Sequence, residues 1–75
     1  MKRVILWQVE DKKDEYLEVL SSKEDAFINA FNHCVIEGLR IVDYQDQICR
    51  GPLTIDYLDP DDGNIETITI TPWFL

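Results

Sequence analysis

The chain has 75 residues, of which 45% are hydrophobic and 29% are charged. Fifteen acidic residues against seven basic ones give a formal net charge of −8. This balance disfavours nucleic acids and anionic membranes as direct partners, because the protein would approach either one against net repulsion. The apolar fraction is too high for an intrinsically disordered protein, so the chain is expected to fold.

A chain of this length buries only about 60% of the surface that its unfolded form exposes. We therefore expect one hydrophobic core and a single domain over residues 1–75. A catalytic pocket would compete with that core for the same apolar side chains, which disfavours an enzyme. The apolar residues 4–7 are too few for the core of a signal peptide, so we expect a cytoplasmic protein. In that compartment Cys34 and Cys49 are expected to be free thiols.

The first elements are predicted to form a β-hairpin. Residues 3–9 and 15–20 are rich in β-branched, aromatic and leucine side chains, and the polar residues 10–14 separate them. Glu15 and Glu18 leave a short helix open as the alternative for the second segment.

A helix is predicted to begin at Ser21 or Ser22. These serines precede Glu24 and Asp25 by three residues, which gives two overlapping capping boxes. Gly38 is expected to end the helix in a left-handed conformation. At 100° per residue, His33 falls on the solvent side, and the face predicted to meet a sheet consists of Phe27, Ala30, Phe31, Cys34 and Val35.

Three more strands are predicted after the helix, at residues 39–44, 53–58 and 65–71. The last two alternate between apolar and polar side chains and are predicted to form a hairpin with Asp62-Gly63 at the centre of its turn. That centre places Ile55 opposite Ile70 and Tyr57 opposite Ile68, and a slip by one residue would mix the two faces. Pro72 is expected to end the ladder because it has no N–H to donate.

The order β-β-α-β-β-β predicts an α+β fold, a single two-layer domain in which a mainly antiparallel sheet carries one helix on one face. The other face of the sheet is expected to remain in water. No internal repeat, low-complexity tract or linker supports a second domain.

No motif in the sequence indicates catalysis, a metal or a cofactor. His33 and Cys34 are adjacent, so on a helix they point about 100° apart and cannot share a proton. One histidine and two distant cysteines do not have the spacing of a zinc site. Residues 59–64 resemble a calcium loop in composition, but the closing glutamate is absent and a hairpin turn explains them. The glycines stand alone at turns, so no phosphate loop is present.

Two features favour a binding surface. From Leu53 to Leu75 the chain contains five acids and no base, and it ends with large aromatic side chains that must be covered by the core or by a partner. The candidate partner-binding residues are Asp56, Asp59, Asp61, Asp62, Glu66, Trp73 and Phe74.

These observations favour a non-enzymatic protein-binding module that occupies a basic surface on another protein. Small acidic inhibitors encoded by phages or mobile elements, which block polymerases, nucleases or CRISPR complexes, share this general character, although no motif here identifies one family. A structural or regulatory subunit of a larger assembly, or a homodimer formed through a strand edge or the C-terminal aromatics, is the second hypothesis. A small enzyme or ligand-binding domain is the third.

Overall fold

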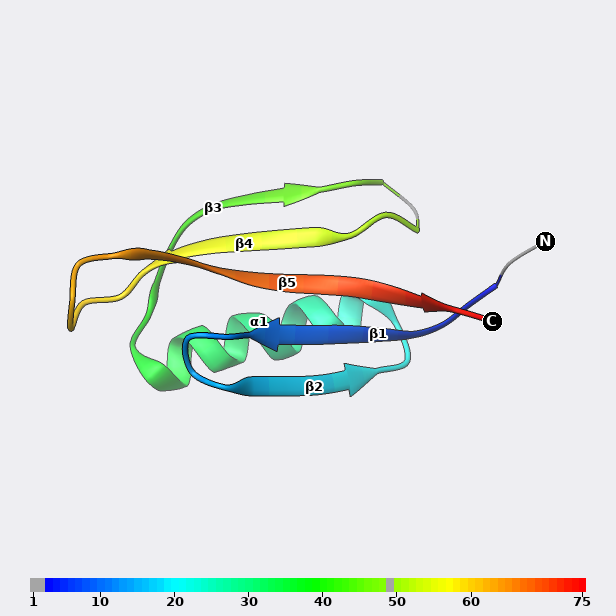
Figure 1. The fold of residues 1–75 in the computed structure, drawn as a ribbon, viewed down its shortest axis with the longest axis horizontal. Helices are drawn as coiled ribbons and strands as arrows, with labels where there is room; N and C mark the ends of the chain where they lie inside the picture. Colours follow the sequence, from blue (N-terminus) through cyan, green and yellow to red (C-terminus); the bar gives the residue numbers. More distant parts are fainter. Residues whose placement is uncertain (1–2, 49) are drawn as a thin grey trace.

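The computed structural model describes residues 3–48 and 50–75, and Cys49, expected to be a free thiol, lies outside them. The elements follow the predicted order and confirm the α+β fold (Figure 1). Their bounds are β1 Val4–Asp11, β2 Tyr16–Leu20, α1 Lys23–Glu37, β3 Arg40–Asp46, β4 Leu53–Leu58 and β5 Ile65–Phe74.

The strands form one five-stranded sheet in the order β2-β1-β5-β4-β3, and every neighbouring pair is antiparallel. The first and last strands of the chain therefore pair at the centre of the sheet. Helix α1 connects the two edge strands and lies across one face, as Figure 1 shows. Within residues 3–48 and 50–75, the opposite face of the sheet carries no helix, as predicted.

Both predicted ends of the helix are confirmed. Ser22 is the N-cap, and its Oγ accepts a hydrogen bond of 3.1 Å from the Asp25 amide. Of the two overlapping capping boxes, the one at Ser22 therefore starts the helix. Gly38 adopts φ 70°, the left-handed conformation that glycine tolerates, and Leu39 N donates to the Cys34 carbonyl at 2.8 Å.

The prediction for the buried face of the helix was partly wrong. Phe31 and Val35 are 47% and 64% exposed, whereas His33, expected in solvent, is only 7% exposed. The helix meets the sheet through small side chains, which let its backbone approach closely, and through His33, which finds a hydrogen-bond partner there. Its buried residues are Ala26, Ala30, His33 and Cys34.

The remaining core comes from the three central strands. Their inward side chains alternate with half-buried or exposed ones, as the period of a strand requires. The buried apolar side chains from the sheet are Trp7, Val9, Leu53, Ile55, Tyr57, Ile68 and Ile70.

The predicted register of the last hairpin was wrong by two residues. Ile55 pairs with Ile68, and Leu53 pairs with Ile70. A shift of two keeps every side chain on its predicted face, so the alternating pattern cannot distinguish the two registers. The observed loop is longer than the predicted turn: Asp59 N donates to Asn64 O at 3.0 Å, and Gly63 N donates to Asp59 O at 2.8 Å.

Pro72 does not end the ladder. Strand β5 continues to Phe74, and Pro72 pairs with Trp7 of β1. Strand β4 begins at Leu53, opposite Ile70, so beyond Ile70 the other side of β5 has no paired β4 residue. A proline is tolerated there because no β4 partner is present to receive an N–H.

Candidate functional site at the acidic end of the sheet

Three segments meet at one end of the sheet: the β1–β2 turn, the last turn of α1 and the β4–β5 loop (Figure 1). We define the acidic end as residues 11–15, Glu37 and residues 59–64. These positions contain seven acids and two lysines, a balance of −5 within a net charge of −8. The fold thus gathers acidic residues that are scattered along the chain.

Lys13 ties the β4–β5 loop to the β1–β2 turn. Its Nζ lies 3.2 Å from Asp59 Oδ2 and forms a second ion pair with Asp62. The Lys13 ammonium holds the pKa of Asp62 below its usual range. No base follows Leu53 in the sequence, but Lys13 of the β1–β2 turn supplies a positive charge beside this loop. Asp59 is only 7% exposed.

The other predicted acids lie in different surroundings. Asp61 is exposed at the tip of the loop. Asp56 pairs with Thr67 and accepts a hydrogen bond of 2.8 Å from its hydroxyl. Glu66 lies opposite Tyr57 at the start of β5.

The two aromatic residues predicted for binding lie far from the acidic loop. Trp73 and Phe74 are at the C-terminal end of β5, the strand that the loop precedes. They pair with Leu6 and Val4 and remain 45% and 46% exposed, so the start of β1 covers them only in part. The structure does not bring these aromatics and the acids into one site.

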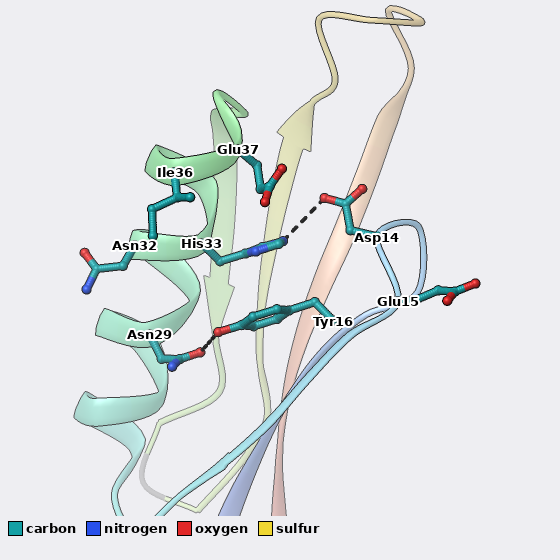
Figure 2. A pocket seen from close by; sticks show the side chains of 8 residues that line it. All are labelled: Asp14, Glu15, Tyr16, Asn29, Asn32, His33, Ile36 and Glu37. Atoms are coloured by element: carbon teal, nitrogen blue, oxygen red, sulfur yellow. Dashed lines mark hydrogen bonds and ion pairs between the residues drawn. The ribbon is translucent and has the colours of Figure 1, made fainter.

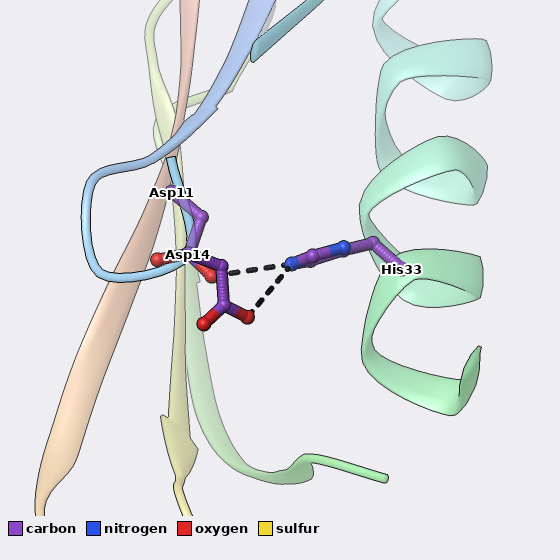
Figure 3. Close-up of side chains that lie close together, drawn as sticks. All are labelled: Asp11, Asp14 and His33. Atoms are coloured by element: carbon purple, nitrogen blue, oxygen red, sulfur yellow. Dashed lines mark hydrogen bonds and ion pairs between the residues drawn. The ribbon is translucent and has the colours of Figure 1, made fainter. Parts of the chain in front are cut away.

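A buried polar network that the sequence did not indicate lies beneath the acidic end. The Asp11 side chain is fully buried, and its Oδ2 accepts a hydrogen bond of 2.8 Å from the Tyr57 hydroxyl. Its Oδ1 accepts a bond of 3.2 Å from the Lys13 amide. Figure 3 shows His33 reaching from the helix toward Asp11 and Asp14, with Nε2 3.2 Å and 3.5 Å from their nearest carboxylate oxygens.

This network borders a pocket of about 480 Å³ between the β1–β2 turn and the helix (Figure 2). The Tyr16 ring stacks on the His33 ring, with centroids 4.0 Å apart, and its hydroxyl donates to Asn29 Oδ1. Burial, followed by the neighbouring Asp11 carboxylate, raises the pKa of Asp14. The pocket is lined by Asp14, Glu15, Tyr16, Asn29, Asn32, His33, Ile36 and Glu37.

The network contains carboxylates and an imidazole, which are the groups that general acid–base catalysis uses. The neighbouring Cys34 thiol, however, is not activated as a nucleophile. Burial raises the pKa of Cys34 to about 11, with smaller contributions from Asp11 and Asp14. The thiol therefore remains protonated near neutral pH and does not provide the thiolate that nucleophilic attack requires. The arrangement of two carboxylates around one imidazole nitrogen is better suited to holding a cation.

A second surface lies on the outer side of the helix. Ile28, Phe31 and Val35 are spaced three and four residues apart, so they form one apolar stripe, and each is about half exposed or more. Beside this stripe, between α1 and β3, is a groove of about 520 Å³. It is lined by Lys23, Glu24, Phe27, Ile28, Tyr44, Asp46 and Leu53.

Comparison with protein-family models, with curated proteins and with solved structures finds no significant match for this chain. Within residues 3–48 and 50–75, no helix is long and apolar enough to cross a membrane.

Proposed function

We propose that this domain is a non-enzymatic protein-binding module that occupies a basic surface on its partner with its acidic end. The observation that supports this most directly is the convergence of seven acids and only two lysines in three neighbouring segments. A concentrated field of one sign steers a protein toward a surface of the opposite sign and accelerates association.

The class of partner follows from the same charge. Extended basic surfaces are the parts of nucleic-acid enzymes that hold phosphates. An acidic domain of this size that covers such a surface would inhibit the enzyme, and polymerases, nucleases and CRISPR complexes all have surfaces of this kind. We therefore infer an inhibitor of nucleic-acid machinery, of the type that phages and mobile elements encode.

The shape of the acidic end also suits a binding role. The two Lys13 ion pairs connect the β4–β5 loop to the β1–β2 turn, so the exposed acids are presented on a joined surface rather than on independent loops. Ordering these loops before binding reduces the entropy lost on association. Glu15, Glu37 and Asp61 are the exposed acids that we expect to contact the partner.

The experiment begins with capture of partners from a host lysate and continues with association kinetics on the purified partner. A triple variant, Glu15→Gln, Glu37→Gln and Asp61→Asn, should slow association about tenfold at low salt and flatten its salt dependence. The matched control removes three exposed charges away from the acidic end, with Glu18→Gln, Glu24→Gln and Asp25→Asn.

The control variant should associate nearly as fast as the wild type. Equal association rates and equal salt dependence for the wild type and the acidic-end variant would exclude this mechanism. Equal slowing by both triple variants would show that net charge acts without a defined site, and would also contradict the proposal.

The exposed stripe of α1 favours a second candidate, a homodimeric or structural component of a larger assembly. Exposed apolar residues that line one helix face often become buried between subunits. Light scattering across a range of concentrations tests this directly. A dimer that Ile28→Ser with Phe31→Ser converts to a monomer would support it, and a monomer at every concentration would exclude self-association.

A further inference from the structure

We propose that Asp11, Asp14 and His33 form a binding site for a divalent transition-metal ion, and that Zn²⁺ is the ion that suits this site best. The proposal is independent of the partner inferred above. It rests on three ligand atoms, one from each side chain, that all lie within 4.8 Å of one another (Figure 3).

The distances in this group are compatible with a shared ion. His33 Nε2 lies 3.2 Å from Asp11 Oδ2 and 3.5 Å from Asp14 Oδ2. Charge-assisted hydrogen bonds are shorter, about 2.7–2.9 Å. Two ligands about 2.0–2.1 Å from a tetrahedral ion are separated by about 3.4 Å, which falls between the two observed values.

The number of hydrogen-bond donors in this group also favours a bound cation. His33 Nε2 faces two carboxylates, and one N–H has a single hydrogen to share between them. A cation at the centre of the group contacts the imidazole nitrogen and both carboxylates at once. It also removes the repulsion between two acids, because two carboxylates and a neutral imidazole balance the charge of a divalent ion.

The surroundings hold two of the ligands in place. The Tyr57 hydroxyl and the Lys13 amide donate to the two oxygens of Asp11, and the Tyr16 ring stacks on the His33 imidazole. Hydrogen bonds of this kind orient carboxylate ligands in metal sites. Asp14 has a side chain that is 30% exposed and borders the pocket, so it provides the entry route and space for a water as fourth ligand.

The donor set selects the kind of metal. Imidazole nitrogen suits zinc and its first-row neighbours, whereas magnesium and calcium prefer sites made of oxygen alone. Three protein ligands with an open fourth position are typical of zinc sites that bind a water or another small ligand.

The test is isothermal titration of untagged, metal-free protein with ZnCl₂, with MgCl₂ titrated in parallel. We expect saturable binding of one Zn²⁺ per chain and a raised melting temperature, with no comparable effect of Mg²⁺. Asp14→Asn is the main variant, since its exposed side chain can change with little effect on folding. It should weaken zinc binding at least about tenfold.

Asp61→Asn is the matched control, because it removes the same charge from the same end without touching the three ligands. It should bind Zn²⁺ within about twofold of the wild type. His33 is the sole histidine in the sequence, so its imidazole ¹⁵N signals report on the site without ambiguity. Zinc should shift the Nε2 resonance.

Three results would each overturn the proposal. These are the absence of saturable zinc binding, equal affinities for the wild type and Asp14→Asn, and zinc binding that leaves the His33 Nε2 resonance unmoved. If Asp61→Asn weakened binding as much as Asp14→Asn, a diffuse acidic surface would be responsible instead of this site.

Discussion

The Tyr57 hydroxyl donates a 2.8 Å hydrogen bond to the Asp11 carboxylate and so joins β4 to β1 across the intervening strand β5. Both side chains are fully buried. The bond connects the core of the domain to the base of the acidic end, and it gives a buried carboxylate one of the partners that burial requires.

Removal of this donor should destabilise the domain. Tyr57→Phe leaves the ring in place but deprives a fully buried carboxylate of a partner, so we expect the free energy of unfolding to fall by about 1–3 kcal/mol. Urea denaturation measures the change. Tyr44→Phe is the control, since Tyr44 is 61% exposed, and a similar loss in both variants would contradict the role of the buried bond.

A core side chain of the sheet and a side chain on the outer face of the helix should differ in their sensitivity to truncation. Ile68 is fully buried in the core, and Ile68→Ala should cost about 2–5 kcal/mol. Val35 is 64% exposed, so Val35→Ala should cost less than about 1 kcal/mol. Thermal unfolding of the two variants compares them. Equal destabilisation would show that Val35 contributes to the core.

Stability should decline in alkaline solution. Burial raises the pKa of Cys34 to about 11 and also raises the pKa of Tyr57, so the folded state holds these protons more tightly than the unfolded state. The contribution of Cys34 to stability is complete below about pH 9 and is lost as the pH rises to about 11, whereas that of Tyr57 begins to decline only above about pH 10.

We expect a loss of about 1–3 kcal/mol over this interval, measured by urea denaturation at several pH values. Cys34→Ala should flatten the decline, because it removes one of the two groups. A profile that is unchanged by this substitution would show that Cys34 does not titrate differently in the two states.

Trp73 should contribute to stability in proportion to its partial burial. It is 45% exposed and lies opposite Leu6, so Trp73→Ala should cost about 1.5–2.5 kcal/mol, roughly half the loss for a fully buried tryptophan. Differential scanning calorimetry of the free protein gives this value. A loss of unfolding free energy below about 0.5 kcal/mol would indicate that Trp73 does not stabilise the free protein and is available to contact a partner.

Local patterns predicted most of the fold. The strands, the serine cap and the glycine stop depend on neighbours in the sequence, and each was located to within a few residues. The register of the last hairpin depends instead on the conformation of its loop. The apolar–polar alternation along the strands determines which face a side chain occupies, but it is identical in two registers that differ by two residues.

The buried network could not be predicted from neighbours alone. Asp11 has the same parity along β1 as the buried residues Trp7 and Val9, but the predicted strand ended at residue 9 and left Asp11 in the following turn. His33 lies three residues after Ala30 and seven after Ala26, on the face where small residues permit close approach. Recognising both required knowing that Ala26 and Ala30, rather than Phe31 and Val35, bring the helix against the sheet. This is decided by how the two layers pack and not by residues that are neighbours in the sequence.

The central position of β5 has a consequence for how the domain folds. The last strand of the described chain completes the ladder of the first, since Phe74 pairs with Val4 and Ile68 with Asp11. Closing so large a loop costs conformational entropy before any contact compensates for it, and such topologies fold slowly. We therefore expect the β1–β2 hairpin and the helix to bury their apolar faces late in folding, when β5 pairs with β1.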